Sequence, residues 1–84
     1  MTYDTPSSIQ RARILKHLED AGSKGASTIE LREQLDILHP AGRVNELREE
    51  GHKVNTRWTV TENAQGKKHR NARYVLINHA ELHR

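Results

Sequence analysis

The sequence predicts an α+β fold in which three helices are followed by an antiparallel β-hairpin. Apolar residues recur with helical spacing before Gly51 and alternate with polar residues after it. Pro40 and Gly51 bound the third helical segment, because proline suits the first helical position and glycine suits the left-handed residue that follows a helix. Only about four residues separate this segment from the one before it, which predicts a tight helix-turn-helix corner.

The first helix is predicted to begin at Thr5-Pro6 or at Ser7, and the spacing from Ser7 to Gln10 matches a capping box. A broad apolar arc follows at helical spacing: Ala12, Ile14, Leu15, Leu18 and Ala21. The segment 22–25 contains two glycines and ends the helix. We expect the apolar arc to cover one side of the core.

A second capping box, formed by Ser27 and Glu30, predicts the start of a short second helix. In the third helix, Val44 and Leu47 are spaced to share a buried face. Small or polar residues fall on or near the opposite face: Gly42, Asn45, Glu46 and Glu49. A helix with such an outer face is suited to a DNA groove.

Two strands are predicted after Gly51. Alternation over residues 54–60 indicates a half-buried strand, residues 70–77 form a second strand, and the polar segment 62–69 joins them. The chain has one Trp, two Tyr and no Phe, so we expect a lean aliphatic core with Trp58 as its anchor. Three helices followed by an antiparallel β-hairpin wing are the element order of a winged helix-turn-helix.

Length and composition exclude several classes of function. The 84 residues suffice for one small domain, expected over residues 1–78 with a tail at 79–84, and leave no room for a large substrate cavity. The absence of cysteine excludes disulfides, cysteine-based zinc sites and thiol catalysis. No apolar run is long enough to span a membrane and the N-terminus lacks signal-peptide features, so we expect a cytoplasmic protein. Catalytic motifs are not evident, and we expect neither an enzyme nor a cofactor.

Positive charge is concentrated in the predicted hairpin. Residues 1–50 contain seven Lys/Arg and nine Asp/Glu, a net charge of −2, whereas residues 51–80 contain six Lys/Arg and one Asp/Glu, a net charge of +5. Such clustering is typical of an element that grips a phosphate backbone. A basic hairpin that merely keeps the protein solvated would give the same pattern.

The segment 35–54, with Thr56, Trp58 and the run Ala72-Arg73-Tyr74, resembles a family of small helix-turn-helix proteins encoded by bacteriophages and prophages. The resemblance extends over about residues 14–76. It implies a winged-helix fold and DNA binding, without indicating the process. Taken with the fold and the charge pattern, we expect sequence-specific binding to double-stranded DNA, in regulation of transcription or as an accessory to replication or excision. Gly42 stands where this family commonly has Ala, which weakens the helix slightly.

Candidate DNA contacts follow from the chemistry of base edges and phosphates. Those on or beside the third helix are His39, Gly42, Arg43, Asn45 and Glu46. Arginine pairs with guanine or phosphate, asparagine with adenine, and glutamate accepts from cytosine. The candidates on the hairpin, expected to contact phosphates or an adjacent minor groove, are Arg57, Lys67, Lys68, His69, Arg70 and Arg73.

Several alternatives stay open. The acidic residues Glu46, Glu49 and Glu50 would suit a protein-interaction module on the same scaffold, because they repel phosphates. The sequence leaves open a homodimer or a phage or host protein partner. Trp58 and Tyr74 would stack on bases in a single-strand binder, although their alternation favours the core. His79 and His83 have helical metal-ligand spacing, but two ligands fall short of the three or four that a site needs.

Overall fold

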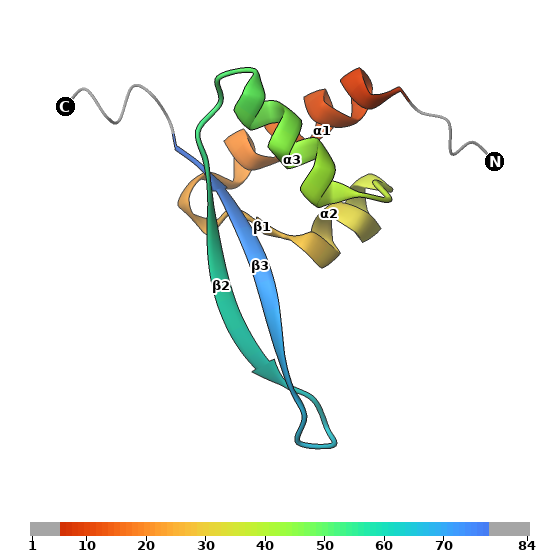
Figure 1. The fold of residues 1–84 in the computed structure, drawn as a ribbon, viewed down its shortest axis with the longest axis vertical. Helices are drawn as coiled ribbons and strands as arrows, with labels where there is room; N and C mark the ends of the chain where they lie inside the picture. The colour runs from red at the N-terminus through yellow and green to blue at the C-terminus, as the bar shows by residue number, and fades with distance from the viewer. Residues whose placement is uncertain (1–5, 78–84) are drawn as a thin grey trace.

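The computed structural model describes residues 6–77 and shows three helices beside a small sheet with a long hairpin (Figure 1). The elements, in chain order, are α1 (Ser7–Ala21), the 3₁₀ turn η1 (Gly22–Lys24), β1 (Ala26–Ser27), α2 (Thr28–Leu35), α3 (Pro40–Glu49), β2 (Val54–Glu62) and β3 (Lys68–Leu76). The predicted order of three helices and a hairpin is confirmed. The tail predicted at 79–84 lies outside the described residues.

The sheet has the strand order β1-β3-β2, with both pairs antiparallel. The hairpin pairs β2 with β3 along their whole length, from Val54 opposite Leu76 to Glu62 opposite Lys68. It is longer than predicted, since β2 runs two residues beyond Val60 and β3 begins two residues before Arg70. The short strand β1, which the sequence analysis did not predict, pairs only with Arg73 and Tyr74. Within the described residues, β2 and the outer half of β3 are therefore sheet edges.

The core lies between the three helices and the base of the hairpin. Its fully buried side chains include Ile14 and Leu18 of α1, Leu31 of α2, and Val44 and Leu47 of α3. The sheet completes it with three residues of one face: Val54, Ala72 and Tyr74. Val75, on the other sheet face, is also buried, which confirms the predicted partial cover there.

The helix ends follow local rules with one exception. Ser27 Oγ accepts from the backbone N–H of Glu30, and the Glu30 side chain caps the N–H of Ser27, which confirms the second capping box. Gly51, which follows the C-cap residue Glu50 of α3, has a φ of +102°, as predicted. The capping box predicted at Ser7 is wrong. Pro6 is the N-cap of α1, and the Ser7 hydroxyl accepts instead from Arg43 of α3.

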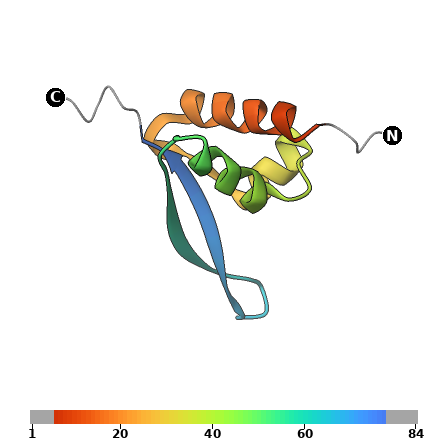
Figure 2. The same ribbon diagram turned by 45° about the horizontal axis from the view of Figure 1, so that its top comes forward.

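Trp58 is not a core residue, which corrects the sequence prediction. It shares a sheet face with the buried Val54, as its alternation predicted, yet it is 58% exposed and the next residue on that face, Val60, is 63% exposed. The cause is visible in Figure 2, where the hairpin runs out beyond the helices. Alternation identifies the face of a strand but not how far along it other elements reach.

Candidate nucleic-acid interface

Helix α3 presents an inner side and two flanks. Pro40, Val44 and Leu47 are buried against the core. One flank contacts α1 and the other contacts the start of β2. Gly42 and Glu49 lie between these flanks, roughly opposite the buried residues. The outer side of α3 is therefore narrow. Which charged side chains it presents to a ligand depends on the ion pairs and hydrogen bonds formed along the two flanks.

The flank toward α1 contains a network of charged side chains. Arg11 Nη1 lies 2.9 Å from Glu46 Oε1, and Arg11 Nε lies 2.8 Å from Glu50 Oε2. Arg43 donates from Nη2 to Glu46 at 2.9 Å and from Nη1 to Ser7 Oγ at 2.7 Å. The hydrogen bond to Glu46 raises the pKa of Arg11, desolvation lowers it, and the charge of Glu50 raises it further, with a net rise. Of the three acids at positions 46, 49 and 50, in α3 and at its C-cap, Glu46 and Glu50 are thus paired with arginine.

Arg43 and Glu46, both proposed from the sequence as base contacts, consequently lie in the contact between α3 and α1. Their side chains are only 21% and 34% exposed. Arg43 Nε is buried without a hydrogen-bond partner, alone among side-chain atoms of residues 6–77. Either residue would have to break its present hydrogen bonds to reach a base edge.

On the flank toward the hairpin, Arg48 forms three hydrogen bonds. The sequence analysis did not identify this residue. Its Nε donates to the backbone carbonyl of Val54 at 2.9 Å, Nη2 to Thr56 Oγ1 at 2.8 Å, and Nη1 to Asn45 Oδ1 at 3.0 Å. These hydrogen bonds link α3 to the hairpin. They also orient the exposed carboxamide of Asn45 through its Oδ1 and do not involve its Nδ2. The available signal was a basic residue in the last helical turn, which commonly bonds nearby carbonyls.

The N-terminal end of α3 is open to contact. His39, the N-cap residue, is exposed and caps no backbone N–H with its side chain. A Cβ built on Gly42 would meet nothing within 4 Å, and its φ is not positive. Neither the backbone nor packing within the described part of the chain therefore requires glycine at this position.

The tip of the hairpin is a turn stabilised by one side chain. Asn63 Oδ1 accepts from the backbone N–H groups of Gln65 and Lys67 at 2.9 and 3.0 Å, and Gly66 has a φ of +81°. The tip residues proposed from the sequence are all exposed: Lys67, Lys68, His69 and Arg70. Within the described ranges, the cationic ones form no ion pair. The tip therefore holds the positive charges of Lys67, Lys68 and Arg70 together, with one carboxylate, Glu62, opposite Lys68 in the register.

Comparison with known proteins accords with this geometry. The family model described as "winged helix-turn-helix domain" matches residues 9–79, well over half of the chain. The chain belongs to the winged helix-turn-helix domain family. No curated protein and no solved structure matches it. In the terms of this family, α2 and α3 form the helix-turn-helix and the β2–β3 hairpin is the wing, and membership supports DNA binding.

Within the winged helix-turn-helix domain, the two arginines proposed on the shaft of the wing differ in their surroundings. Arg57 is exposed and forms no ion pair with a described residue. Arg73 lies opposite it in the register, 2.9 Å from Glu30 Oε1, and also donates to the carbonyl of Lys24 at 3.0 Å. The ion pair of Arg73 with Glu30 thus links the base of the wing to the first turn of α2. Arg57 is available to a ligand.

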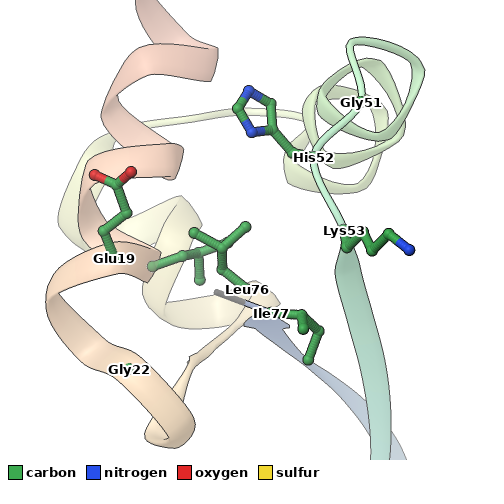
Figure 3. Close-up of a pocket in the computed structure, with 8 residues that line it drawn as sticks. Glu19, Gly22, Gly51, His52, Lys53, Leu76 and Ile77 are labelled. Carbon is green, nitrogen blue, oxygen red and sulfur yellow. The ribbon is translucent and has the colours of Figure 1, made fainter. Parts of the chain in front are cut away.

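A hollow of about 260 Å³ lies at the other end of the winged helix-turn-helix domain, where the wing begins. Figure 3 shows Glu19 and His52 on opposite sides of it with Leu76 between them, while the Lys53 side chain points away. It lies at the end of the sheet away from the wing tip, beside the residues that follow α3. The described residues include no helix long and apolar enough to span a membrane and no cluster of three or more His, Cys, Asp or Glu suited to a metal. His79 and His83 lie outside those residues.

Proposed function

We propose that the chain binds double-stranded DNA with sequence preference, with α3 in the major groove and the wing on neighbouring phosphates. The supporting observation is that two acids, in α3 and at its C-cap, are paired with arginines, whereas most cations of the wing are not paired. Glu46 and Glu50 are paired with arginines on the α1 flank, while Arg57, Lys67, Lys68 and Arg70 of the wing have no ionic partner among residues 6–77, and only Arg73 at its base is paired, with Glu30. A surface with unpaired cations, beside a helix whose Glu46 is paired with arginines, suits a polyanion.

In this proposal, base contacts come from the outer and N-terminal part of α3, namely His39, Gly42 and Asn45. Arg43 and Glu46 act mainly by fixing α3 against α1. The proposed phosphate contacts are Arg57, Lys67, Lys68, His69 and Arg70, with Arg73 holding the wing in place. Wing contacts to phosphate would raise affinity for all sequences, whereas α3 would distinguish among them.

We further propose that the DNA is that of a phage or prophage, and that the chain regulates its transcription or assists its replication or excision in the host cytoplasm. The resemblance of the segment 35–54 to phage-encoded proteins supports this context. The alternative of a protein-interaction module had rested on the three acids Glu46, Glu49 and Glu50, in α3 and at its C-cap. Within the described residues, Glu49 is the one of these acids that forms no ion pair, which weakens that argument.

Fluorescence anisotropy with labelled duplexes of mixed sequence, at two salt concentrations, tests the proposal. We expect binding at low salt and a linear fall of log K with log salt, because bound cations release counterions from the duplex. Selection from a random duplex library should then enrich a shared site. Absence of duplex binding at low salt would overturn the proposal, and binding without any enriched site would reduce it to non-specific DNA binding.

A further inference from the structure

The outer half of the wing has one face on which apolar and cationic side chains lie together, and this face ends in Glu62 opposite Lys68. Trp58 and Val60 are 58% and 63% exposed, and Arg70 lies directly opposite Val60 in the register. The other face is polar, with Asn71 Nδ2 bonded to Thr61 Oγ1 at 2.8 Å. Alternation along the strands keeps the two faces distinct. Exposed large apolar side chains gathered on one face indicate a surface that is covered by a partner.

Arg70 is positioned by the indole that it covers. Its guanidinium carbon lies 4.5 Å from the centroid of the Trp58 ring, a cation–π geometry. No carboxylate of the described residues forms an ion pair with it. The stack leaves more than half of the Trp58 side chain accessible and places a planar, fork-shaped donor beside it. Apolar surface and a phosphate-binding group are thus adjacent on the two paired strands of the wing.

This face continues the exposed side of α3. Asn45 is bonded to Arg48, and Arg48 is bonded to Thr56. Trp58 and Val60 follow Thr56 at every second position of β2, on the same sheet face. A ligand that touches both α3 and the wing tip therefore passes along Thr56, Trp58 and Val60.

We propose that Trp58 is a DNA contact, and that its indole packs against deoxyribose of the duplex strand between α3 and the wing tip while Arg70 binds the adjoining phosphate. The inference rests on the proposed duplex binding. A sugar–phosphate strand alternates apolar rings with anions, and the face places the apolar Trp58 and Val60 beside the cationic Arg70, so the two match in chemistry. Contact with sugar and phosphate predicts a similar effect on all duplex sequences.

The single tryptophan of the chain provides a direct probe. Acrylamide quenching of its fluorescence is measured with and without saturating duplex, and duplex affinity is measured by anisotropy for the parent, Trp58→Ala and Ile9→Ala. Ile9 is an exposed apolar residue of α1, 45% accessible, and serves as the matched control. Thermal melts verify that each variant is folded, and single strands of the same sequence are tested in parallel.

We expect duplex to shield the indole from acrylamide, and Trp58→Ala to weaken binding to every duplex roughly tenfold at an unchanged melting temperature. Ile9→Ala should bind like the parent. If duplex binds but the indole stays equally accessible and Trp58→Ala binds normally, the inference is wrong and duplex binding stands. Tighter binding to single strands that depends on Trp58 would replace sugar contact with base stacking. Absence of any duplex binding would remove the proposed function and this inference together.

Discussion

Arg11 of α1 and Glu46 of α3, separated by 35 positions in the sequence, form an ion pair with Nη1 2.9 Å from Oε1. The same carboxylate also accepts from Arg43, so that Glu46 joins two arginines at the contact between the helices. This pairing compensates a negative charge on the proposed recognition helix and helps to fix that helix against its neighbour.

Glu46→Gln should destabilise the domain by roughly 1 kcal/mol, because it removes the charged acceptor of a partly buried network. Affinity for mixed-sequence duplex should be retained or slightly increased, since one negative charge is lost. Urea unfolding and anisotropy measure the two effects. Glu49→Gln is the matched control on the same helix and should leave the stability unchanged. A stable Glu46→Gln variant that loses preference for a selected site would instead make Glu46 a base contact.

Replacing Lys67, Lys68 and Arg70 together by Ala should weaken binding to all duplexes similarly and flatten the log–log salt dependence by roughly two to three units, about one for each lost phosphate contact. The three side chains are exposed, so the melting temperature should change little. The control replaces three exposed lysines away from the wing tip: Lys16, Lys24 and Lys53. An equal loss of salt dependence in both triple variants would show that net charge, and not the wing, sets the affinity.

Asn45→Ala should lower the preference for a selected site over mixed sequence by about 1–3 kcal/mol, as expected for loss of a good base contact. Binding to mixed sequence should fall less. Competition titrations with selected and scrambled duplexes give the ratio directly. Asn55→Ala, also an exposed asparagine, is the control. Unaltered preference in Asn45→Ala would place recognition of the bases elsewhere on α3 or the wing.

Gly42→Ala should stabilise the domain by about 0.5–1 kcal/mol, because the position is helical and a Cβ there has open space. Gly25→Ala should destabilise it by about 2–4 kcal/mol. At Gly25, φ is +63° and a Cβ would overlap the carbonyl oxygen of Tyr74. Chemical denaturation of the two variants tests the pair of predictions, and a destabilised Gly42→Ala would contradict the open environment at that position.

The stability of the domain should depend on Glu30 at acidic pH. Burial raises the pKa of Glu30, but the N–H of Ser27 and the charge of Arg73 outweigh it, so that the pKa is lowered from 4.5. The carboxylate therefore contributes stability that is fully present above about pH 4.5 and is lost as the pH falls through the folded-state pKa. Urea unfolding of the parent and Glu30→Gln at neutral and acidic pH should show a difference that shrinks on acidification. If the difference in stability between the parent and Glu30→Gln is the same at both pH values, the predicted role of the Glu30 carboxylate is wrong.

The order of the main elements was predictable because its signals are local. The capping box at Ser27, Pro40 at the start of α3 and Gly51 after it each act within one turn of chain. Strand β1 was not predictable in this way, since Ala26 and Ser27 are a strand only through their pairing with β3. Trp58 was assigned to the correct sheet face, but its exposure depends on how far the helices extend over the wing.

The sequence predicted which segments form the candidate site better than it predicted the role of each residue in them. The concentration of charge in the wing depends on composition, and the exposed Lys67 and Lys68 follow from it. The partners of Arg43 and Arg73 depend instead on how α1 packs on α3 and α2 on β3, which no local pattern contains. Arg48 was missed for the same reason, because its role arises where α3 meets β2.

The open edges of the wing bear on how the protein behaves at high concentration. A long strand with unpaired backbone groups is a template for adding a strand from another molecule, and charged side chains on it oppose such stacking. Strand β2 is an edge along its whole length in the described sheet, and the cations of the wing lie on or beside it. The charges proposed to attract phosphate would thus also keep neighbouring copies apart. Neutralising them would favour fibrous aggregation as well as weaker DNA binding.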